Sequence, residues 1–217
     1  MTTLVLIRHG ESVVTVQRRI GGLRTCSGLT ELGRAQVTAL AERAAHTGEL
    51  VCDVLVSSTM PRAIQTAEIL AAAAGATSFE QDPTMCEQDP GDCDGMTFDD
   101  YVKQFGTPDW GGDPDAVVFP GGETVRAFHR RVADGLDALL ARHHGKRVVV
   151  ACHGGVIDAS LRHLLGVPMV GQFELHTFNA SVTELGWRPS MWKLVRYNDA
   201  AHLHGLHSEP VRVTSEG

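Results

Sequence analysis

Short aliphatic runs alternate with amphipathic segments along most of the chain. The runs LVLI (4–7), DVLVSS (53–58) and KRVVVACHGG (146–155) each end at a polar residue or a glycine turn. Continuous aliphatic runs of this length are typical of strands that are buried on both faces. Because helical segments follow these strands, the order predicts an α/β fold with three α/β/α layers around a mostly parallel central sheet.

Four segments have the apolar spacing of helices. Thr30 begins the first as a candidate cap, and Pro61 suits the first position of the second, with Thr59 near its cap and Gly75 as its stop. The four predicted helices lie within LTELGRAQVTALAERAAHTG (29–48), PRAIQTAEILAAAAG (61–75), GGETVRAFHRRVADGLDALLARHHG (121–145) and VIDASLRHLLG (156–166).

Two further segments complete the predicted organisation. ASVTELGW (180–187) and MWKLVRYN (191–198) are separated by Arg188, Pro189 and Ser190, which predicts a hairpin. Residues 82–121 are rich in Asp, Gly and Pro, with one short helical stretch around 97–105. We therefore expect a single domain over residues 1–217, with an irregular lid-like insertion at about 82–121.

Composition narrows the function classes. The 217 residues are 43% hydrophobic and carry a formal net charge of −7, which argues against a broad nucleic-acid or anionic-membrane surface. No apolar run approaches the roughly 20 residues that cross a bilayer, and MTTLVLIRHG does not resemble a signal peptide. Five cysteines without CxxC spacing fit reduced thiols. We expect a cytoplasmic protein, and any anion site must be local.

Arginine and histidine residues follow the predicted strands, at or just after the point where each strand ends. Arg8 and His9 follow the first strand, Arg62 lies just inside the helix after the second, and His153 follows the third. The carboxyl ends of parallel strands face one crevice, so two guanidinium groups and two imidazoles should meet there. Arginine donors and helix N-termini bind phosphate well. Each residue alone could be structural. A metal held by the two histidines is disfavoured, because the arginines would repel it and no HExxH motif is present.

The blocks LVLIRHGES, GLTELGRAQ, SSTMPRAIQTAEIL and VVVACHGGVI, in this order, resemble the histidine phosphatase superfamily, also called the phosphoglycerate-mutase-like family. The resemblance runs from residue 4 to about 198. It implies that His9 is the nucleophile and forms a phosphohistidine, while Arg8, Arg62 and His153 hold the phosphoryl oxygens. The family's acid matches Glu87, followed by Gly91 and Gly95, which implies that Glu87 is the general acid.

The same resemblance implies lesser contacts at the phosphate and at the substrate entrance. It assigns them to Gly10, Thr15, Gly21, Gly22 and Gly154. These glycines could instead be ordinary turn residues. Thr15 stands where many family members have asparagine, and Leu23, Cys26 and Cys93 replace frequent Trp or Asp residues. These departures change residues at the rim of the expected site, so the resemblance does not indicate which substrate the protein uses.

Three functions remain compatible with the sequence. The preferred one is a metal-independent phosphomonoester hydrolase without a cofactor, acting on a small phosphorylated metabolite. The first alternative is a cofactor-dependent phosphoglycerate mutase, although EQDPGDCDGMTFDD (87–100) is acidic and residues 82–121 contain no arginine. A phosphate-binding module without catalysis is the second alternative, which the presence of both a nucleophile and an acid disfavours. The oligomeric state cannot be read from the sequence.

Overall fold

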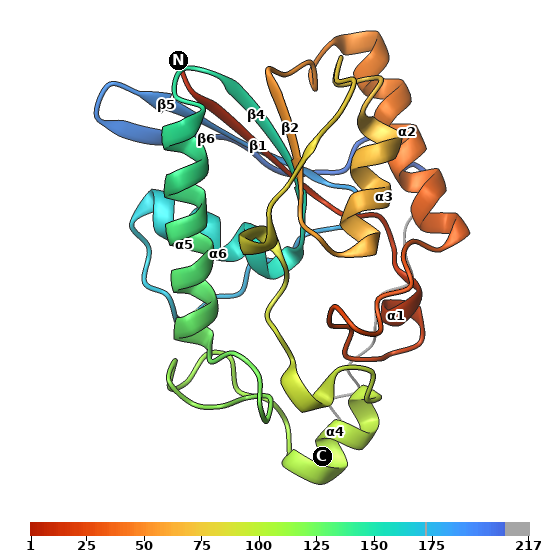
Figure 1. Cartoon of the computed structure of the whole chain (residues 1–217), viewed down its shortest axis with the longest axis vertical. Helices are drawn as coiled ribbons and strands as arrows, with labels where there is room; N and C mark the ends of the chain where they lie inside the picture. The colour runs from red at the N-terminus through yellow and green to blue at the C-terminus, as the bar shows by residue number, and fades with distance from the viewer. Residues whose placement is uncertain (172, 207–217) are drawn as a thin grey trace.

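A central sheet of six strands organises the part of the chain that the structure describes, residues 1–171 and 173–206 of this computed structural model (Figure 1). The strand order is β3-β2-β4-β1-β5-β6. Three pairings are parallel, β1 with β4, β4 with β2 and β2 with β3, and two are antiparallel, β1 with β5 and β5 with β6. The strands are β1 (Thr3–Arg8), β2 (Val54–Ser57), β3 (Glu80–Gln81), β4 (Arg147–Cys152), β5 (Val182–Arg188) and β6 (Met191–Asp199).

Helices cover both faces of this sheet, which confirms the predicted three-layer α/β/α fold. Helices α2 and α3 lie on one side, and α5 and α6 on the other (Figure 1). Thr30 accepts a hydrogen bond from the Gly33 amide and so caps α2 as predicted. The helices are α1 (Val13–Val16), α2 (Glu31–Thr47), α3 (Pro61–Leu70), α4 (Phe98–Phe105), α5 (Val125–Arg142) and α6 (Gly154–Leu165).

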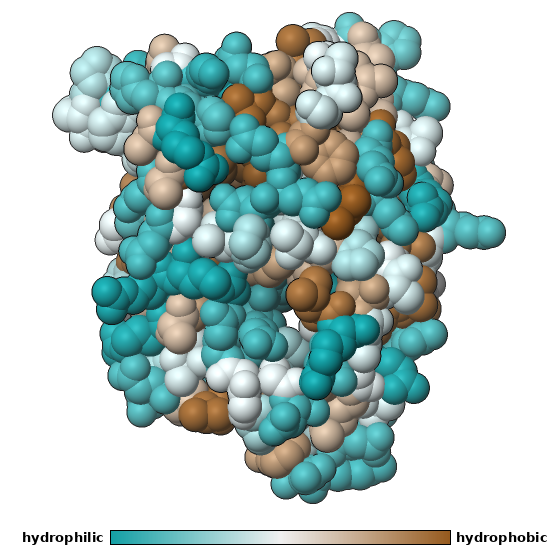
Figure 2. All heavy atoms as spheres, in the orientation of Figure 1, coloured by the Kyte–Doolittle hydropathy of each residue, from teal (hydrophilic) through white to brown (hydrophobic). Residues whose placement is uncertain are grey.

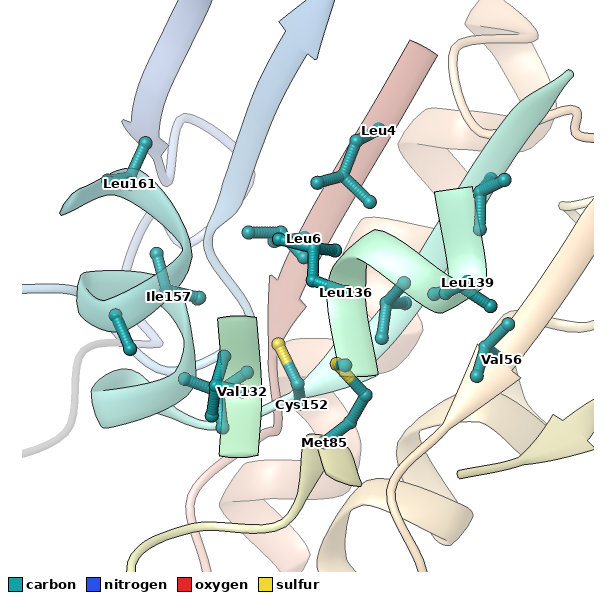
Figure 3. Packing of buried hydrophobic residues seen from close by; sticks show 14 of the residues in the cluster. Leu4, Leu6, Val56, Met85, Val132, Leu136, Leu139, Cys152, Ile157 and Leu161 are labelled. Atoms are coloured by element: carbon teal, nitrogen blue, oxygen red, sulfur yellow. The ribbon is translucent and has the colours of Figure 1, made fainter. Parts of the chain in front are cut away.

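Alternation along β1 divides the core into two layers. Leu4 and Leu6 pack with α5 and α6 (Figure 3), whereas Val5 and Ile7 pack with α2 and α3. All four side chains are fully buried. Burying a residue of this kind contributes roughly 1.5–3 kcal/mol, so the middle of the sheet is a rigid base for the loops at its carboxyl edge.

Met85, near the start of residues 82–121, packs in the core beside α5 (Figure 3), and the larger part of the segment lies below the sheet, at the end where β1 runs toward α1 (Figure 1). The segment contains α4 and two short 3-10 helices, Pro83–Met85 and Gly91–Cys93. Helix α4 lies where the sequence predicts a short helical stretch, and Thr97 caps it by accepting from the Asp100 amide. The segment has its own apolar cluster, which includes Cys93, Tyr101 and Phe119. Its description as a lid stays a prediction.

Local details differ from the sequence pattern in three places. Thr59 directly precedes Met60, the N-cap residue of α3, but its hydroxyl makes no capping hydrogen bond and instead lies 3.1 Å from Cys86 Sγ. The α3 helix ends at Leu70 and gives way to turns before Gly75. The strand β3 has only two residues, both exposed, and carries no hydrophobic signal. The five cysteines are free.

The surface seen in Figure 2 is mainly hydrophilic, with separate hydrophobic patches. Among the described residues, no helix is long and apolar enough to cross a membrane.

Candidate active site

Three parallel strands bring the predicted arginines and histidines to one edge of the sheet. Strand β4 lies between β1 and β2, and Arg8 pairs in register with Cys152. The His9 amide continues this ladder by donating to the Cys152 carbonyl at 2.9 Å. His153 is the N-cap residue of α6, and Arg62 occupies the first turn of α3. The topology therefore places all four residues together, as the strand-end pattern predicts.

The two imidazoles share one guanidinium donor. Arg62 Nε lies 3.1 Å from His9 Nε2 and 3.2 Å from His153 Nδ1. The other nitrogen of His9, Nδ1, lies 2.6 Å from the Gly10 carbonyl, to which it can only donate. His9 is thus assigned the tautomer with a proton on Nδ1 and a lone pair on Nε2. That lone pair points at the Arg62 guanidinium.

His153 is held in the opposite tautomer. Its Nδ1 accepts from Arg62, and its Nε2 lies 2.7 Å from the hydroxyl of Ser58, a fully buried residue that directly follows β2. The ring centroids of His9 and His153 are 5.1 Å apart in an edge-on arrangement. Sequence reasoning misses Ser58, since a serine after a strand is common and only the fold brings it to His153.

Both imidazoles are uncharged at neutral pH. Burial lowers the pKa of His9 well below its ordinary value, and the positive charges of Arg62 and Arg8 lower it further. The pKa of His153 is also well below its ordinary value, first through burial and then through Arg62 and His9. Neutral rings retain the lone pairs on His9 Nε2 and His153 Nδ1 that face Arg62.

Arg8 offers a donor that the described residues leave unused. Its Nη1 donates to the Thr177 carbonyl, while its Nε is buried and has no hydrogen-bond partner among the described residues. Burial lowers the pKa of Arg8, whereas the nearby Glu87 carboxylate raises it. A buried donor without a partner is costly, so an anion bound here would gain a ready hydrogen bond.

Glu87, which belongs to residues 82–121, lies beside the cluster formed by the two arginines and the two histidines. Its Oε2 accepts from the Gly155 amide at 3.0 Å, in the first turn of α6, and its Oε1 accepts from the Gln88 amide at 3.1 Å. Its charge also acts on Arg8. The carboxyl group predicted from the family pattern is therefore next to the first turn of α6, the helix that His153 precedes as N-cap residue.

The five lesser residues lie at different distances from this cluster. The Gly21 carbonyl accepts from Arg62 Nη1 at 3.2 Å, and a Cβ on Gly154 would lie 3.6 Å from Arg8 Nε. Gly10 accepts from His9 and passes so close to α2 that a Cβ would lie 2.4 Å from the Gly33 carbonyl oxygen. The glycines at 10, 21 and 154 therefore touch the cluster directly.

Gly22 and Thr15 make other contacts. The Gly22 amide donates to Asp94 Oδ1 at 2.9 Å, which fastens the loop after α1 to residues 82–121. The Thr15 hydroxyl lies 2.9 Å from the Ser12 hydroxyl. Within the described part of the chain, neither residue hydrogen-bonds to Arg8, His9, Arg62 or His153, so their predicted role in substrate binding stays a prediction.

The described residues contain no group of three or more His, Cys, Asp and Glu side chains that could hold a metal ion. Two guanidinium groups and two uncharged imidazoles at the end of a parallel sheet instead suit a phosphate group. This chemistry defines the class of site, and the comparisons with known proteins identify the family.

The family model of the histidine phosphatase superfamily (branch 1) matches residues 4–200. The chain therefore belongs to the histidine phosphatase superfamily. It is 30% identical to the uncharacterised phosphatase PhoE of Bacillus subtilis over 214 residues, which cover 95% of this chain and 99% of that protein. It is 31% identical over 211 residues to a protein of Yersinia pestis named as a probable phosphoglycerate mutase, GpmB, with 94% and 95% covered.

Solved structures with the same fold include phosphatases. A histidine-to-alanine mutant of phosphoserine phosphatase from Entamoeba histolytica, in complex with phosphoserine, has a TM-score of 0.77 at 25% identity, covering 94% of this chain and 100% of that one. A mycobacterial glucosyl-3-phosphoglycerate phosphatase has a TM-score of 0.76 at 28% identity, covering 90% and 98%. The structural neighbours are therefore phosphoglycerate-mutase-like phosphatases.

Proposed function

We propose that this protein is a phosphomonoester hydrolase that acts through a phosphohistidine on His9. The observation that carries the proposal is the contact between Arg62 Nε and the unprotonated Nε2 of His9, at 3.1 Å. This contact places the unprotonated nitrogen of His9 beside a cation that can bind phosphate, and phosphoryl transfer to a histidine needs the two groups side by side in this way. The resemblance to phosphatases over nearly the whole chain supports the same reaction.

In the first step, His9 Nε2 attacks phosphorus in line with the ester oxygen. The nitrogen–phosphorus bond forms as the bond to the leaving oxygen breaks. Arg8 and Arg62 donate to the remaining oxygens, where negative charge is concentrated in the transition state. His153 donates as well once a proton is on its Nδ1, because its Nε2 can then accept from the Ser58 hydroxyl. Because the arginines supply this positive charge, the reaction needs no metal ion or organic cofactor.

Glu87 completes both halves of the reaction. It donates its proton to the leaving oxygen, so that an alcohol departs rather than an alkoxide. The resulting carboxylate then removes a proton from water, which attacks phosphorus and breaks the bond to His9. Inorganic phosphate and free His9 are the products, and Glu87 is protonated again.

The substrate is proposed only as a small phosphorylated metabolite, and its hydrolysis in the cytoplasm stays a prediction. An acidic rim favours monophosphates over highly charged bisphosphates. Phosphoserine and glucosyl-3-phosphoglycerate, named for the two structural relatives, are the first compounds to try.

The test measures phosphate release from a panel of monophosphates in the presence of a chelator, for the wild type, His9→Ala and Glu87→Gln. The panel includes 3-phosphoglycerate with its 2,3-bisphosphate. Release by the wild type with loss in His9→Ala is the expected result. Isomerisation of 3-phosphoglycerate without release would replace the hydrolase with a mutase, and silence in every assay would leave a binding module.

A further inference from the structure

The guanidinium group of Arg131, on α5, binds both the segment that carries Glu87 and the carboxylate of Glu123. Its Nη1 donates to the carbonyls of Thr84 at 2.7 Å and Cys86 at 3.1 Å, and its Nη2 donates to the Glu87 carbonyl at 3.2 Å. The two remaining N–H groups, the one on Nε and the second one on Nη2, donate to the two carboxylate oxygens of Glu123, each at 2.8 Å. Five N–H groups thus make five bonds, which is the full capacity of an arginine.

Glu123 holds the same segment from its other end. Its Oε2 accepts from the Asp89 amide at 3.0 Å, its carbonyl accepts from Gln88 Nε2 at 2.8 Å, and its amide donates to the Asp89 carbonyl at 3.0 Å. Residues 84–89 are therefore clamped on both sides of Glu87. Apart from the 3-10 turn Pro83–Met85, this stretch has no helix or strand to fix its backbone.

The Arg131–Glu123 ion pair is largely shielded from solvent, so its geometry is better fixed than that of an exposed pair. The side chains of Arg131 and Glu123 are 24% and 21% exposed. Burial alone raises the pKa of Glu123, but the hydrogen bonds from Arg131 and from the Asp89 amide lower it, with a net downward shift. Both groups are therefore charged at neutral pH. A bidentate arginine–carboxylate pair is the rigid form of such a contact.

We propose that the Arg131–Glu123 pair positions the Glu87 carboxyl group for proton transfer to the leaving oxygen. The proposal rests on the proposed role of Glu87 as general acid. Arg131 touches the backbone of Glu87 and not its carboxyl group, so it is a positioning residue. Small displacements of a catalytic group are costly in rate, and a loosened 84–89 segment displaces this one.

Substrates whose leaving groups differ in acidity distinguish a pair that positions Glu87 from a pair that only stabilises the fold. A nitrophenolate departs without a proton, whereas the alkoxide of an alkyl phosphate needs one. The experiment measures kcat/KM, which reports steps up to release of the alcohol, for 4-nitrophenyl phosphate and for glycerol phosphate. The ratio of the two values in one sample does not depend on the fraction of enzyme that is folded.

The variants are Arg131→Lys, Arg131→Met and Glu123→Gln, with Glu87→Gln as the reference. Arg130→Met is the matched control, since Arg130 is the neighbouring residue of α5 and its side chain is 81% exposed. We expect roughly 10- to 100-fold loss with glycerol phosphate in the three variants and less than about threefold loss with the nitrophenyl ester. Lysine should not rescue, because it lacks the planar fork.

Two results overturn these ideas separately. If Glu87→Gln changes the ratio but the Arg131 and Glu123 variants lower both rates in proportion, the pair only stabilises the fold and the positioning proposal is wrong. If Glu87→Gln itself leaves the ratio unchanged, the proposed general acid is wrong. Should the Arg131 variants not fold, Glu123→Gln, which keeps the shape of the side chain, decides between these outcomes.

Discussion

Arg62 Nε donates a hydrogen bond to His9 Nε2 over 3.1 Å, and both side chains are buried. The nitrogen that the proposed mechanism uses as nucleophile is thus in contact with the cation that the mechanism uses to bind phosphate. A substrate must take over this donor before His9 can attack. Phosphoryl oxygens can do so, because they are stronger acceptors than a neutral imidazole.

Arg62→Lys should therefore impair catalysis although the charge is kept. Lysine has no planar group to face both imidazoles and a phosphoryl oxygen. Loss of one such donor typically costs about 10²–10³ in rate, and we expect a fall of this size in kcat/KM. Arg34→Lys, on the exposed side of α2, is the control. Near-normal activity of Arg62→Lys would show that charge alone suffices.

The two buried histidines should make the fold sensitive to acid. Their pKa values in the folded state lie well below the value of about 6.5 in an unfolded chain. Between these values the unfolded chain binds more protons, so the free energy of unfolding falls as the pH falls below about 6.5. Each histidine contributes a slope of up to about 1.4 kcal/mol per pH unit. Well above pH 6.5, both histidines are neutral in the folded and in the unfolded chain, so neither makes the free energy of unfolding depend on pH.

Urea unfolding from pH 5 to 8 measures this effect. His202, whose pKa is lowered to about 4, adds to the slope of the wild type. Removal of one buried histidine, in His9→Asn or His153→Asn, should flatten the acid side by up to about 1.4 kcal/mol per pH unit. A slope unchanged in both variants would contradict the assignment of neutral rings. The lowered pKa of His9 also predicts that the acid limb of kcat/KM lies below pH 6.5.

Gly155→Ala should damage proton transfer without unfolding the protein. The added Cβ would lie 2.3 Å from Glu87 Oε1 and 3.2 Å from Phe128 Cζ, so the carboxyl group must move. Alanine favours a helix by up to about 1 kcal/mol over glycine, which offsets part of the strain. We expect loss of activity mainly with alkyl phosphates and a melting temperature within a few degrees of the wild type. Equal losses with aryl and alkyl phosphates would argue against displacement of Glu87.

Asp94→Asn should loosen the loop that follows α1. The Asp94 carboxylate accepts from the amides of Gly22 and Arg24, each at 2.9 Å, and from the Thr25 hydroxyl. Asparagine turns an N–H group toward these donors, at a cost of about 1–3 kcal/mol in the free energy of unfolding. Because Gly21 in this loop contacts Arg62, we expect KM to rise. Asp92→Asn, in the adjoining 3-10 helix but exposed, should leave KM unchanged.

Much of the fold follows from the hydrophobic pattern, for a physical reason. Strands β1, β2 and β4 are continuous aliphatic runs because both of their faces are covered. Their polar ends mark the edge of the sheet, so the sequence alone predicts that Arg8, His9 and His153 share one site. The sequence also predicts helix α2 together with its cap, because Thr30 and the apolar spacing agree.

Other features depend on contacts between distant segments. Ser58 orients His153 across 95 positions of the chain, and Arg131 reaches backbone carbonyls about 45 residues away. The residues next to Ser58 and Arg131 in the sequence do not indicate which distant groups these side chains contact. The short strand β3 forms only because β2 lies beside it. Local propensity cannot specify such features, since the partner supplies most of the energy.

The central claim is that His9 becomes phosphorylated during turnover, and trapping this intermediate tests it most directly. Wild type, His9→Ala and Glu87→Gln are mixed with 4-nitrophenyl phosphate, whose leaving group needs no proton from Glu87. The reaction is quenched in alkali, which preserves phosphohistidine, and the modified residue is located by peptide mass spectrometry. We predict phosphate on His9 in the wild type, more of it in Glu87→Gln, and none in His9→Ala. Turnover with the phosphate on another residue, or continued turnover by His9→Ala, would contradict the account.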